Sequence, residues 1–417
     1  MADAQRIPLG DHVADAVALL AAVRGTEVIA LDGRAVGRVA AREQRARVDV
    51  PGHDDSQMDG FAVAAVDVAA TTVTLPLGPT IAAGDPPSTL APGTARPIMT
   101  GAPLPAGAEL VIPVEESERG AFAAGAEQGG TVTLTPASRA AGRFLRARGS
   151  DTHRGDTVLR EGQVLTPARI AHLAACGARD LEVVAPLRTI VLSTGAEVLA
   201  PGADLPAAGR LFDANGPGLA AALTDAGAEV VHVGAVSDDA AALLEHLRAQ
   251  VAAHDADLIV TSGGVSAGAF EVIRHAAQHA GARLAFPKVA MQPGGPQGIG
   301  TLDLPERRVP WLAFPGNPVS ALLSCELIAR PALGAPERRR LLLPLQLEAA
   351  EASPPALAQY RRARVLPSGR VRLAGGASSH LIGGYAAADA LVVVPVGVDA
   401  VRDGDVLETL LIPGGDR

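Results

Sequence analysis

The apolar residues in the second half of the chain fall into short runs that alternate with amphipathic stretches. Each run is dominated by aliphatic residues, and in the stretch that follows it the apolar positions recur every three or four residues. This alternation of strand and helix predicts a parallel, doubly wound sheet, whose ligands bind at the carboxyl ends of its strands. The predicted strands cover residues 189–194, 229–236, 257–262 and 311–314, and the predicted helices cover residues 216–227, 238–253, 269–280 and 318–333.

The rest of the chain has a different pattern. Residues 1–30 place apolar side chains at helical spacing after Asp11, the expected cap, and a second helix is predicted over Pro167–Cys176 with Thr166 as its cap. Between these helices, short Val, Thr and Leu runs are interrupted by Gly and Pro, which is typical of β-rich structure. Residues 337–417 return to short strands and glycine-rich turns, which predict a small β-barrel or sandwich.

These changes of pattern predict a multidomain protein of α/β and β domains. The segments on either side of the β-rich region are expected to pack together, so that this region is an insertion. The predicted domains are a discontinuous helical and dimerisation domain at 1–50 and 146–185, an inserted β-rich domain at 51–145, an α/β domain at 186–336 and a C-terminal β-barrel domain at 337–417.

Composition excludes several classes of protein. The 417 residues are 48% hydrophobic with a formal net charge of −9, which favours a folded chain and disfavours nucleic acid or an anionic membrane as the main partner. No apolar run approaches the roughly 18 residues of a membrane span, and the N-terminus lacks a secretion signal, so we expect a cytoplasmic protein. Cys176 and Cys325 provide no disulfide framework, and we interpret His275 and His279 as surface residues rather than zinc ligands.

Lys288 is the single lysine in the chain, and the other 35 of the 36 basic residues are arginine. Arginine is a flat fork that keeps its proton, whereas lysine is a compact point charge that can titrate. The bias is consistent with a GC-rich genome, in which case the lone lysine has no special meaning. The alternative is a site that requires an ammonium group, for which Lys288 is the candidate.

Glycine-rich loops follow three of the four predicted strands. Glycine lets the backbone approach a ligand closely, and the helix that follows offers free N–H groups to an anion. One such loop can be ordinary turn chemistry, but three at one edge of a sheet favour a phosphate or oxyanion site. None matches GxGxxG or GxxxxGK[ST], which disfavours an ordinary dinucleotide or P-loop site. The candidate binding residues are Ser193, Thr194, Gly195, Ser262, Gly263, Gly264, Ser266, Pro315, Gly316 and Asn317.

Carboxylates accompany the same loops, as Glu197, Asp213, Asp238 and Glu271. Carboxylate oxygens beside a bound phosphate are ligands that Mg²⁺ takes in proteins, so a magnesium site is one interpretation. Helix capping is the competing explanation for Asp213 and Asp238, because each begins a predicted helix.

Two polar segments in the first half, around Asp59 and around Thr100, complete a set of ordered motifs. Taken alone, each segment is an ordinary loop. Taken together, the motifs resemble the molybdopterin molybdenumtransferase family, which includes the bacterial enzyme of molybdenum cofactor synthesis and the E domain of gephyrin. The motifs are DSQMDGFAV, IMTGAPLPAGAE, STGAEV, DANGPGLAAAL, TSGGVSAG, FPKVAMQPGGPQG, FPGNPVSALLS and SSHLIGGYAAADALVVVP.

The resemblance implies a homodimer of elongated four-domain subunits, with a molybdopterin-binding α/β domain, an inserted β-rich domain and a C-terminal β-barrel. It also implies the reaction, in which adenylylated molybdopterin and molybdate are the substrates, the metal is inserted at the dithiolene, and AMP is released in a Mg²⁺-dependent step. The implied partners are a second copy, the small-molecule pterin and the oxyanion, with other cofactor-synthesis proteins and apo-molybdoenzymes as candidates. Neither nucleic acid nor a membrane is expected as a partner.

The resemblance also assigns roles to individual residues. Asp59 and Thr100 match functional positions of the inserted domain, which in the dimer is expected to face the α/β domain of the other subunit. Lys288 matches the first lysine of a K-x-x-x-K-P-G-K-P pattern. The resulting expectations are catalytic roles for Asp59, Thr100, Glu197, Asp238 and Lys288, Mg²⁺ binding by Glu197, Asp238 and Glu271, and substrate binding by Asp213, Arg362, Ser379 and the loop residues named above.

The chain departs from the family pattern at three positions. Gln292 and Gly295 stand where the pattern has its second and third lysines, and Glu271 stands where it has an aspartate. The loss of two cations weakens the potential for an anion by up to a few kcal/mol for each close charge. Three explanations of these departures remain open. Arginines elsewhere compensate for the lost charge, or the affinity for molybdate is lower, or the chain is a diverged paralogue. A non-catalytic scaffold or carrier for molybdopterin or a peptide and a preference for tungstate are the competing functions.

Overall fold

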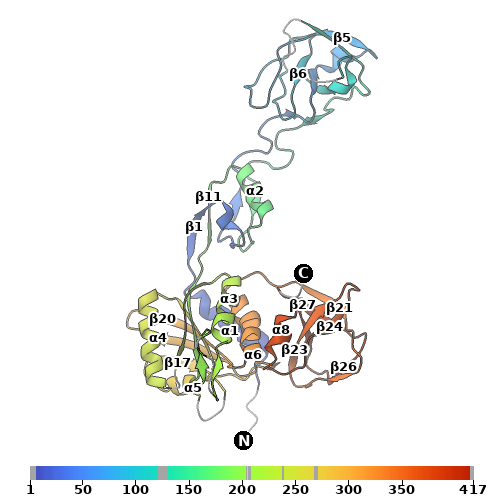
Figure 1. Ribbon diagram of the computed structural model, residues 1–417. Coiled ribbons are helices and arrows are strands. Elements are labelled where there is room, and N and C mark those ends of the chain that lie inside the picture. The colour runs from blue at the N-terminus through green and yellow to red at the C-terminus, as the bar shows by residue number, and fades with distance from the viewer. Residues whose placement is uncertain are drawn as a thin grey trace. The chain divides into compact units, whose positions relative to one another are not determined.

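The computed structural model describes residues 6–120, 130–202, 204, 208–236, 239–266 and 271–413 (Figure 1). The chain forms two compact units. One consists of Met1–Thr26 with Val184–Arg417, and the other consists of Glu27–Val183. Within the described ranges, no helix combines the length and the apolar character that crossing a membrane requires.

A six-stranded sheet forms the centre of the first unit, in the order β15, β12, β16, β20, β19, β17. The first four of these strands run parallel, as predicted. β19 pairs antiparallel with β20, and β17 pairs antiparallel with β19, so the prediction of a parallel sheet is wrong at this edge. A tight connection from β19 to β20 reverses the chain without a crossover helix. The strands are β12 (Arg188–Thr194), β15 (Glu229–Val236), β16 (Leu258–Ser262), β17 (Ala282–Ala285), β19 (Gly298–Asp303) and β20 (Arg308–Phe314).

Helices cover both faces of this sheet, as the predicted doubly wound fold requires. Residues of α1, α3 and α6 share one hydrophobic core with the C-terminal strands, and Figure 1 shows these helices between the two sheets. Residues of α4 and α5 form the other core, around Trp311. The helices are α1 (Leu9–Ala21), α3 (Asn215–Asp225), α4 (Ala240–His254), α5 (Val272–Ala276), α6 (Pro318–Ser324), a π-helical turn at Cys325–Ala329, α7 (Arg330–Ala332) and α8 (Ile382–Ala386).

The helix starts test the predicted caps. Helix α1 begins after Pro8, and Asp11 lies inside its first turn, so the prediction that Asp11 caps this helix is wrong. Helix α2 (Pro167–Ala175) begins after Thr166, whose hydroxyl accepts a hydrogen bond from the Arg169 N–H at 3.3 Å. That cap is confirmed.

A second sheet in the first unit lies on the far side of α1, α3 and α6 from the central sheet (Figure 1). Its strand order is β18, β23, β25, β27, β21, and β24 pairs with β23. The C-terminal region is therefore β-rich, as predicted. No pairing among the described strands joins β18 to β21, and closure into a barrel stays a prediction. The strands are β18 (Met291–Gln292), β21 (Arg340–Pro344), β23 (Ala358–Val365), β24 (Val371–Leu373), β25 (Ala390–Val394) and β27 (Val406–Leu411), with β22 (Glu351–Ala352) and β26 (Ala400–Val401) as a separate pair.

The second unit contains the β-rich insertion and the strands that flank it. A three-stranded sheet in the order β6, β4, β7 and the pair β5 with β8 enclose one hydrophobic core. The flanking strands pair across long sequence separations, β1 with β11, β2 with β10 and β3 with β9. The strands are β1 (Thr26–Ala30), β2 (Gln44–Arg45), β3 (Asp55–Ser56), β4 (Gly60–Val63), β5 (Val73–Pro76), β6 (Arg96–Ile98), β7 (Leu110–Pro113), β8 (Thr131–Leu134), β9 (Leu145–Arg146), β10 (Thr157–Leu159) and β11 (Asp180–Val184), with 3₁₀ turns at Gly33–Ala35, Ala65–Val68 and Val114–Glu116.

Candidate active site

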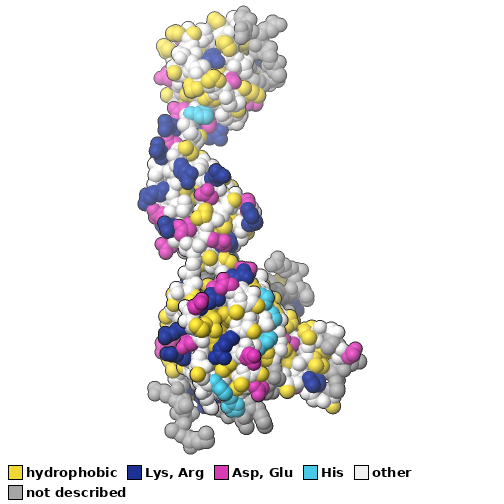
Figure 2. All heavy atoms as spheres, turned by 90° about the vertical axis from the view of Figure 1, so that its left-hand side faces the viewer, with side chains coloured by type: hydrophobic (Ala, Val, Ile, Leu, Met, Phe, Trp, Pro, Cys, Tyr) yellow, Lys and Arg dark blue, Asp and Glu magenta, His cyan; other side chains and the backbone are white. Residues whose placement is uncertain are grey.

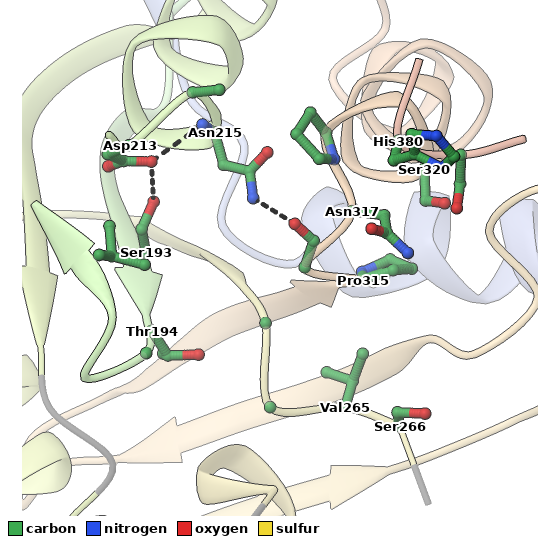
Figure 3. A pocket seen from close by; sticks show the side chains of 18 of the residues that line it. Ser193, Thr194, Asp213, Asn215, Val265, Ser266, Pro315, Asn317, Ser320 and His380 are labelled. Atoms are coloured by element: carbon green, nitrogen blue, oxygen red, sulfur yellow. Dashed lines mark hydrogen bonds between the residues drawn. The ribbon is translucent and has the colours of Figure 1, made fainter. Parts of the chain in front are cut away.

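The carboxyl ends of β12, β16 and β20 open into a cavity of about 800 Å³. Its walls include the three predicted glycine-rich loops, at residues 193–195, 263–266 and 315–317 (Figure 3). The short strands β13 (Val198–Leu199) and β14 (Leu211–Phe212) add apolar side chains. A cavity of this size at this edge of an α/β sheet is typical of a small-molecule site.

Two glycines are required where the chain leaves β16. A Cβ atom added to Gly263 would lie 2.5 Å from the hydroxyl oxygen of Thr194, and the φ angle of Gly263 is +100°. A Cβ atom added to Gly264 would lie 2.9 Å from Cγ1 of Val272, and its φ angle is +64°. Glycine adopts both conformations without the strain that a side chain would bring. The two glycines therefore let the loop turn closely past β12 and into the cavity wall.

Asp213 holds one side of the cavity together (Figure 3). Its Oδ1 atom accepts hydrogen bonds from the Ser193 hydroxyl and from the backbone N–H groups of Asn215 and Gly216, each at 2.9 Å. The side chain amide of Asn215 in turn donates to the carbonyl oxygen of Gly316 at 2.7 Å. Asp213 is buried and stabilises the first turn of α3, which agrees with helix capping, the alternative to Mg²⁺ binding that the sequence left open for this residue.

Two further carboxylates line the cavity. The Glu197 carboxylate folds back over Gly195, so that a Cβ atom added to that glycine would lie 2.7 Å from Oε2. Oε2 of Glu271 accepts a hydrogen bond from the Ser266 N–H at 2.9 Å. Asp238, the third predicted Mg²⁺ ligand, lies outside the described residues. Within them, no three His, Cys, Asp or Glu side chains come together as a metal site.

The ionisable side chains that line the described cavity wall are Glu197, Asp213, Glu271 and His380. No arginine or lysine is among these lining residues. An anionic ligand would therefore be stabilised here by backbone N–H groups, by hydroxyl groups and by the His380 imidazole.

Lys288 and Ser262 do not line the cavity. Lys288 is exposed, its carbonyl oxygen accepts a hydrogen bond from the Ile7 N–H at 2.9 Å, and it forms a β-bridge with Pro296, a residue of the cavity wall. Ser262 is buried, and its hydroxyl donates to the carbonyl oxygen of Pro315 at 3.2 Å. Ser262 thus supports one of the loops from behind.

Arg362 lies behind the C-terminal part of the cavity wall. It is 1% exposed on β23, and its Nη2 atom donates to the carbonyl oxygens of Gly376 and of Ser378, the latter at 3.2 Å. Ser379, the next residue, lines the cavity. Nε and Nη1 of Arg362 have no hydrogen-bond partner within the described part of the chain. Burial lowers the pKa of this guanidinium, and the nearby charge of Arg361 lowers it further.

The two positions at which the family pattern has a lysine and this chain does not, Gln292 and Gly295, have different surroundings. The Gln292 side chain accepts a hydrogen bond from the Gln359 amide at 2.8 Å, so an amide pair stands where the pattern has an ammonium group. A Cβ atom added to Gly295 would lie 3.2 Å from the carbonyl oxygen of Val289 and 3.5 Å from Nη1 of Arg6. Arg6 therefore lies beside Gly295, one of the two positions at which the family pattern has a lysine.

Asp59 and Thr100 are in contact with each other in the second unit. Oδ1 of Asp59 accepts hydrogen bonds from the Thr100 N–H at 2.7 Å and from the Thr100 hydroxyl at 2.9 Å. Both residues are exposed, and they lie just before β4 and just after β6. The structure therefore brings together the two candidates of the inserted domain.

Sequence reasoning did not single out several residues of the cavity wall. Asn215 and Ser320 lie inside motifs that carry the family resemblance, so their position in those motifs is a usable signal. Leu211 and Phe212 are 51% and 38% exposed, which sequence alone does not show. His380 also lies inside such a motif, directly after Ser379, although neither periodicity nor spacing singles it out.

Three regions of the chain match models of known protein families. Residues 7–177 match the MoeA N-terminal region (domain I and II), residues 190–335 match the probable molybdopterin binding domain, and residues 344–412 match the MoeA C-terminal region (domain IV). The three glycine-rich loops of the cavity all lie within the second of these regions.

Individual proteins are similar over nearly the whole chain. Molybdopterin molybdenumtransferase 2 of Mycobacterium tuberculosis is 40% identical over 393 residues, which cover 90% of this chain and 92% of the relative. The molybdopterin molybdenumtransferase of Synechococcus elongatus is 33% identical over 382 residues, covering 89% of this chain and 91% of the relative. The crystal structure of the molybdopterin biosynthesis MoeA protein from Pyrococcus horikoshii matches with a TM-score of 0.77 and 26% identity, covering 98% of this chain and 100% of that one.

Proposed function

The chain belongs to the molybdopterin molybdenumtransferase family and is an enzyme of molybdenum cofactor biosynthesis, and we propose that it inserts molybdate into adenylylated molybdopterin with release of AMP. One observation carries this reaction. The cavity at the carboxyl ends of β12, β16 and β20 is built from loops that lie inside the region matching a molybdopterin binding domain. The proposed ligand has an aromatic part and a phosphate part. The cavity offers apolar side chains for the first, and glycine-rich loops and hydroxyl groups for the second.

The chain's own residues bind and orient the substrate in this proposal. Leu211 and Phe212 provide an apolar wall for a flat ring. The glycine-rich loops let the backbone approach the phosphates, while the hydroxyl groups of Thr194 and Ser266 offer hydrogen bonds. The reaction needs no covalent nucleophile, because an oxygen of molybdate or water attacks the pterin-linked phosphorus of the pyrophosphate group, and the bond from this phosphorus to the bridging oxygen breaks as AMP leaves. Lys288 does not line the cavity, but it pairs with Pro296 of the cavity wall, and by the family pattern its ammonium group would neutralise charge on phosphate or molybdate.

Mg²⁺ fits the donor set of the cavity. Glu197 and Glu271 present carboxylate oxygens there, and Asp238 would add a third by the family pattern. Mg²⁺ is commonly held by one or two carboxylates together with substrate phosphate, and Glu197 and Glu271 would supply such carboxylates. When bound, the ion would stabilise the negative charge on the pyrophosphate group.

We also propose that the enzyme acts as a homodimer, in which Asp59 and Thr100 of one subunit serve the cavity of the other. The family resemblance supports this arrangement.

The reaction is tested by incubating the purified protein with adenylylated molybdopterin, molybdate and Mg²⁺ and measuring AMP release. Wild-type protein should release AMP, and Glu197→Gln and Glu271→Gln should each reduce the rate by at least tenfold, whereas Glu245→Gln, on the exposed face of α4, should not. A wild-type protein that binds the pterin but releases no AMP would instead indicate a scaffold or carrier. Competition between molybdate and tungstate in the same assay determines which oxyanion is preferred.

The dimer is tested by mixing two inactive variants, Asp59→Ala and Glu197→Ala. If Asp59 serves the other subunit's cavity, half of the dimers contain one intact site out of two, and about a quarter of wild-type activity returns. If both residues act within one chain, mixing restores nothing, and this arrangement is overturned. Light scattering on the wild-type protein measures the oligomeric state independently.

A further inference from the structure

His380 is the one described residue lining the cavity whose side chain can carry a positive charge. The other ionisable groups of this wall are the carboxylates Glu197, Asp213 and Glu271. Figure 3 shows His380 beside Ser320, on the side of the cavity away from Asp213 and Ser193. Asp213 and His380 therefore lie on opposite sides of the cavity. An anionic group would be repelled by the first and attracted by the second.

The imidazole ring of His380 is held by the side chain of Ser378. The Ser378 hydroxyl and Nδ1 of His380 lie 2.7 Å apart, a hydrogen-bond distance. If the hydroxyl donates to Nδ1, the ring proton of the neutral imidazole lies on Nε2. A positively charged ring also carries a proton on Nε2. In both states Nε2 is a hydrogen-bond donor.

The backbone around His380 is fixed on both sides. The buried Arg362 guanidinium donates to the Ser378 carbonyl oxygen at 3.2 Å, and the Val319 N–H donates to the Ser379 carbonyl oxygen at 3.3 Å. The Ile382 N–H donates to the carbonyl oxygen of His380 itself at 3.0 Å. These contacts join β23, α6 and α8 to the segment. A side chain on a segment held in this way is placed in advance of ligand binding.

We propose that His380 donates a hydrogen bond from Nε2 to an anionic group of the bound ligand, and that it selects anionic ligands over neutral ones. The inference rests on the proposed function, because it assumes that the substrate's phosphate or oxyanion group enters this cavity. Ser378 is a positioning residue that fixes the ring. Arg362 positions the same segment from behind.

AMP and adenosine are matched probes for this proposal, since they differ only in the phosphate group. Their dissociation constants are measured by calorimetry for wild type, His380→Ala, His380→Gln and Ser378→Ala, with His279→Ala as the control because that exposed histidine does not line the cavity. Loss of a hydrogen bond to a charged group predicts at least tenfold weaker AMP binding for His380→Ala and unchanged adenosine binding. His380→Gln keeps an N–H donor and should lose less, and Ser378→Ala should be intermediate.

Equal weakening of AMP and adenosine in His380→Ala would overturn the proposal, because it would indicate a general change of the cavity. Unchanged AMP binding, or a wild-type protein that binds no AMP, would overturn it as well. The turnover assay decides the proposed function separately. If the wild-type protein releases AMP but His380→Ala binds AMP normally, the proposed function stands and the role of His380 is rejected. If His380→Ala weakens AMP binding but the wild-type protein shows no turnover, the role of His380 stands and the proposed function is rejected.

Discussion

One carboxylate oxygen of Asp59 accepts two hydrogen bonds from Thr100, although 41 residues separate the two in sequence. The backbone N–H of Thr100 donates at 2.7 Å and its hydroxyl at 2.9 Å. This contact ties the turn before β4 to the loop after β6. It also fixes the direction of both side chains at the surface of the inserted domain.

Replacing Thr100 by valine should separate the role of its hydroxyl from that of its backbone. Thr100→Val keeps the N–H bond and loses the hydroxyl bond, which at this exposed position should cost about 1 kcal/mol or less of unfolding free energy. Because we propose a catalytic role for the pair, AMP release should fall by at least tenfold. Urea unfolding and the turnover assay measure the two effects.

Thr100→Ser is the matched control, because serine retains the hydroxyl group. It should keep most of the activity. If Thr100→Val is as active as wild type, the pair contributes only to the local structure.

Asp213→Ala should destabilise the first unit. The substitution leaves the Ser193 hydroxyl and the N–H groups of Asn215 and Gly216 without their common acceptor, at a cost of about 2–3 kcal/mol. Trp311 is the only tryptophan of the chain and is fully buried in this unit, so its fluorescence reports the loss during urea unfolding.

The control for this substitution is Asp213→Asn, which retains one oxygen acceptor of the same shape. Asp213→Asn should retain more than half of the unfolding free energy that Asp213→Ala loses. Equal stability of Asp213→Ala and wild type would contradict the assigned role of this carboxylate in the first turn of α3.

The sequence was sufficient to predict the parallel part of the central sheet, because buried parallel strands are aliphatic runs. All five residues of β16 (Leu258–Ser262) are buried, and the predicted strand covers residues 257–262. The antiparallel strands β19 and β17 lack this signal. β19 has the sequence GIGTLD, in which glycine, threonine and aspartate interrupt the aliphatic residues, so hydrophobic pattern alone does not distinguish it from a loop.

In the candidate site, too, some features could be predicted from the sequence and others could not. Loops that follow buried strands were predictable as cavity residues, since topology brings the carboxyl ends of parallel strands together. Lys288 is conspicuous by its rarity and its motif, but neither feature encodes whether a side chain faces a cavity. Ser262 belongs to a correct loop, yet its hydroxyl is used by the backbone of a neighbouring loop. Such directions depend on tertiary contacts.

Both cysteines should resist alkylation in the folded protein. Cys325 is fully buried, and burial raises the pKa of its thiol to about 12, so roughly one part in ten thousand is thiolate at about pH 8. Burial also raises the pKa of Cys176. Mass spectrometry after iodoacetamide treatment should find neither thiol modified in the native state and both modified in guanidinium chloride. Rapid native labelling of Cys325 would contradict its burial.

A half-buried ion pair in the inserted domain gives a stability contribution that depends on pH. Nη1 and Nη2 of the Arg143 guanidinium donate to the two carboxylate oxygens of Glu116, at 2.8 and 2.6 Å. Glu116 Oε2 also accepts the Ala137 N–H at 2.9 Å. The hydrogen bonds from Arg143, and to a lesser degree the one from Ala137, hold the pKa of Glu116 below its usual value.

Glu116→Gln should therefore destabilise the protein at neutral pH and lose this effect in acid. A carboxylate with a lowered folded-state pKa stabilises the folded protein above its unfolded pKa of about 4.3, and this contribution is lost as the pH falls through the lower, folded value. The expected penalty is about 1 kcal/mol at pH near 7, decreasing below pH of about 4.3. Urea unfolding followed by circular dichroism across this range measures it. Arg143→Gln should show the same pH dependence because it removes the same pair, whereas a Glu116→Gln penalty that is constant with pH would mean that the carboxylate charge contributes nothing.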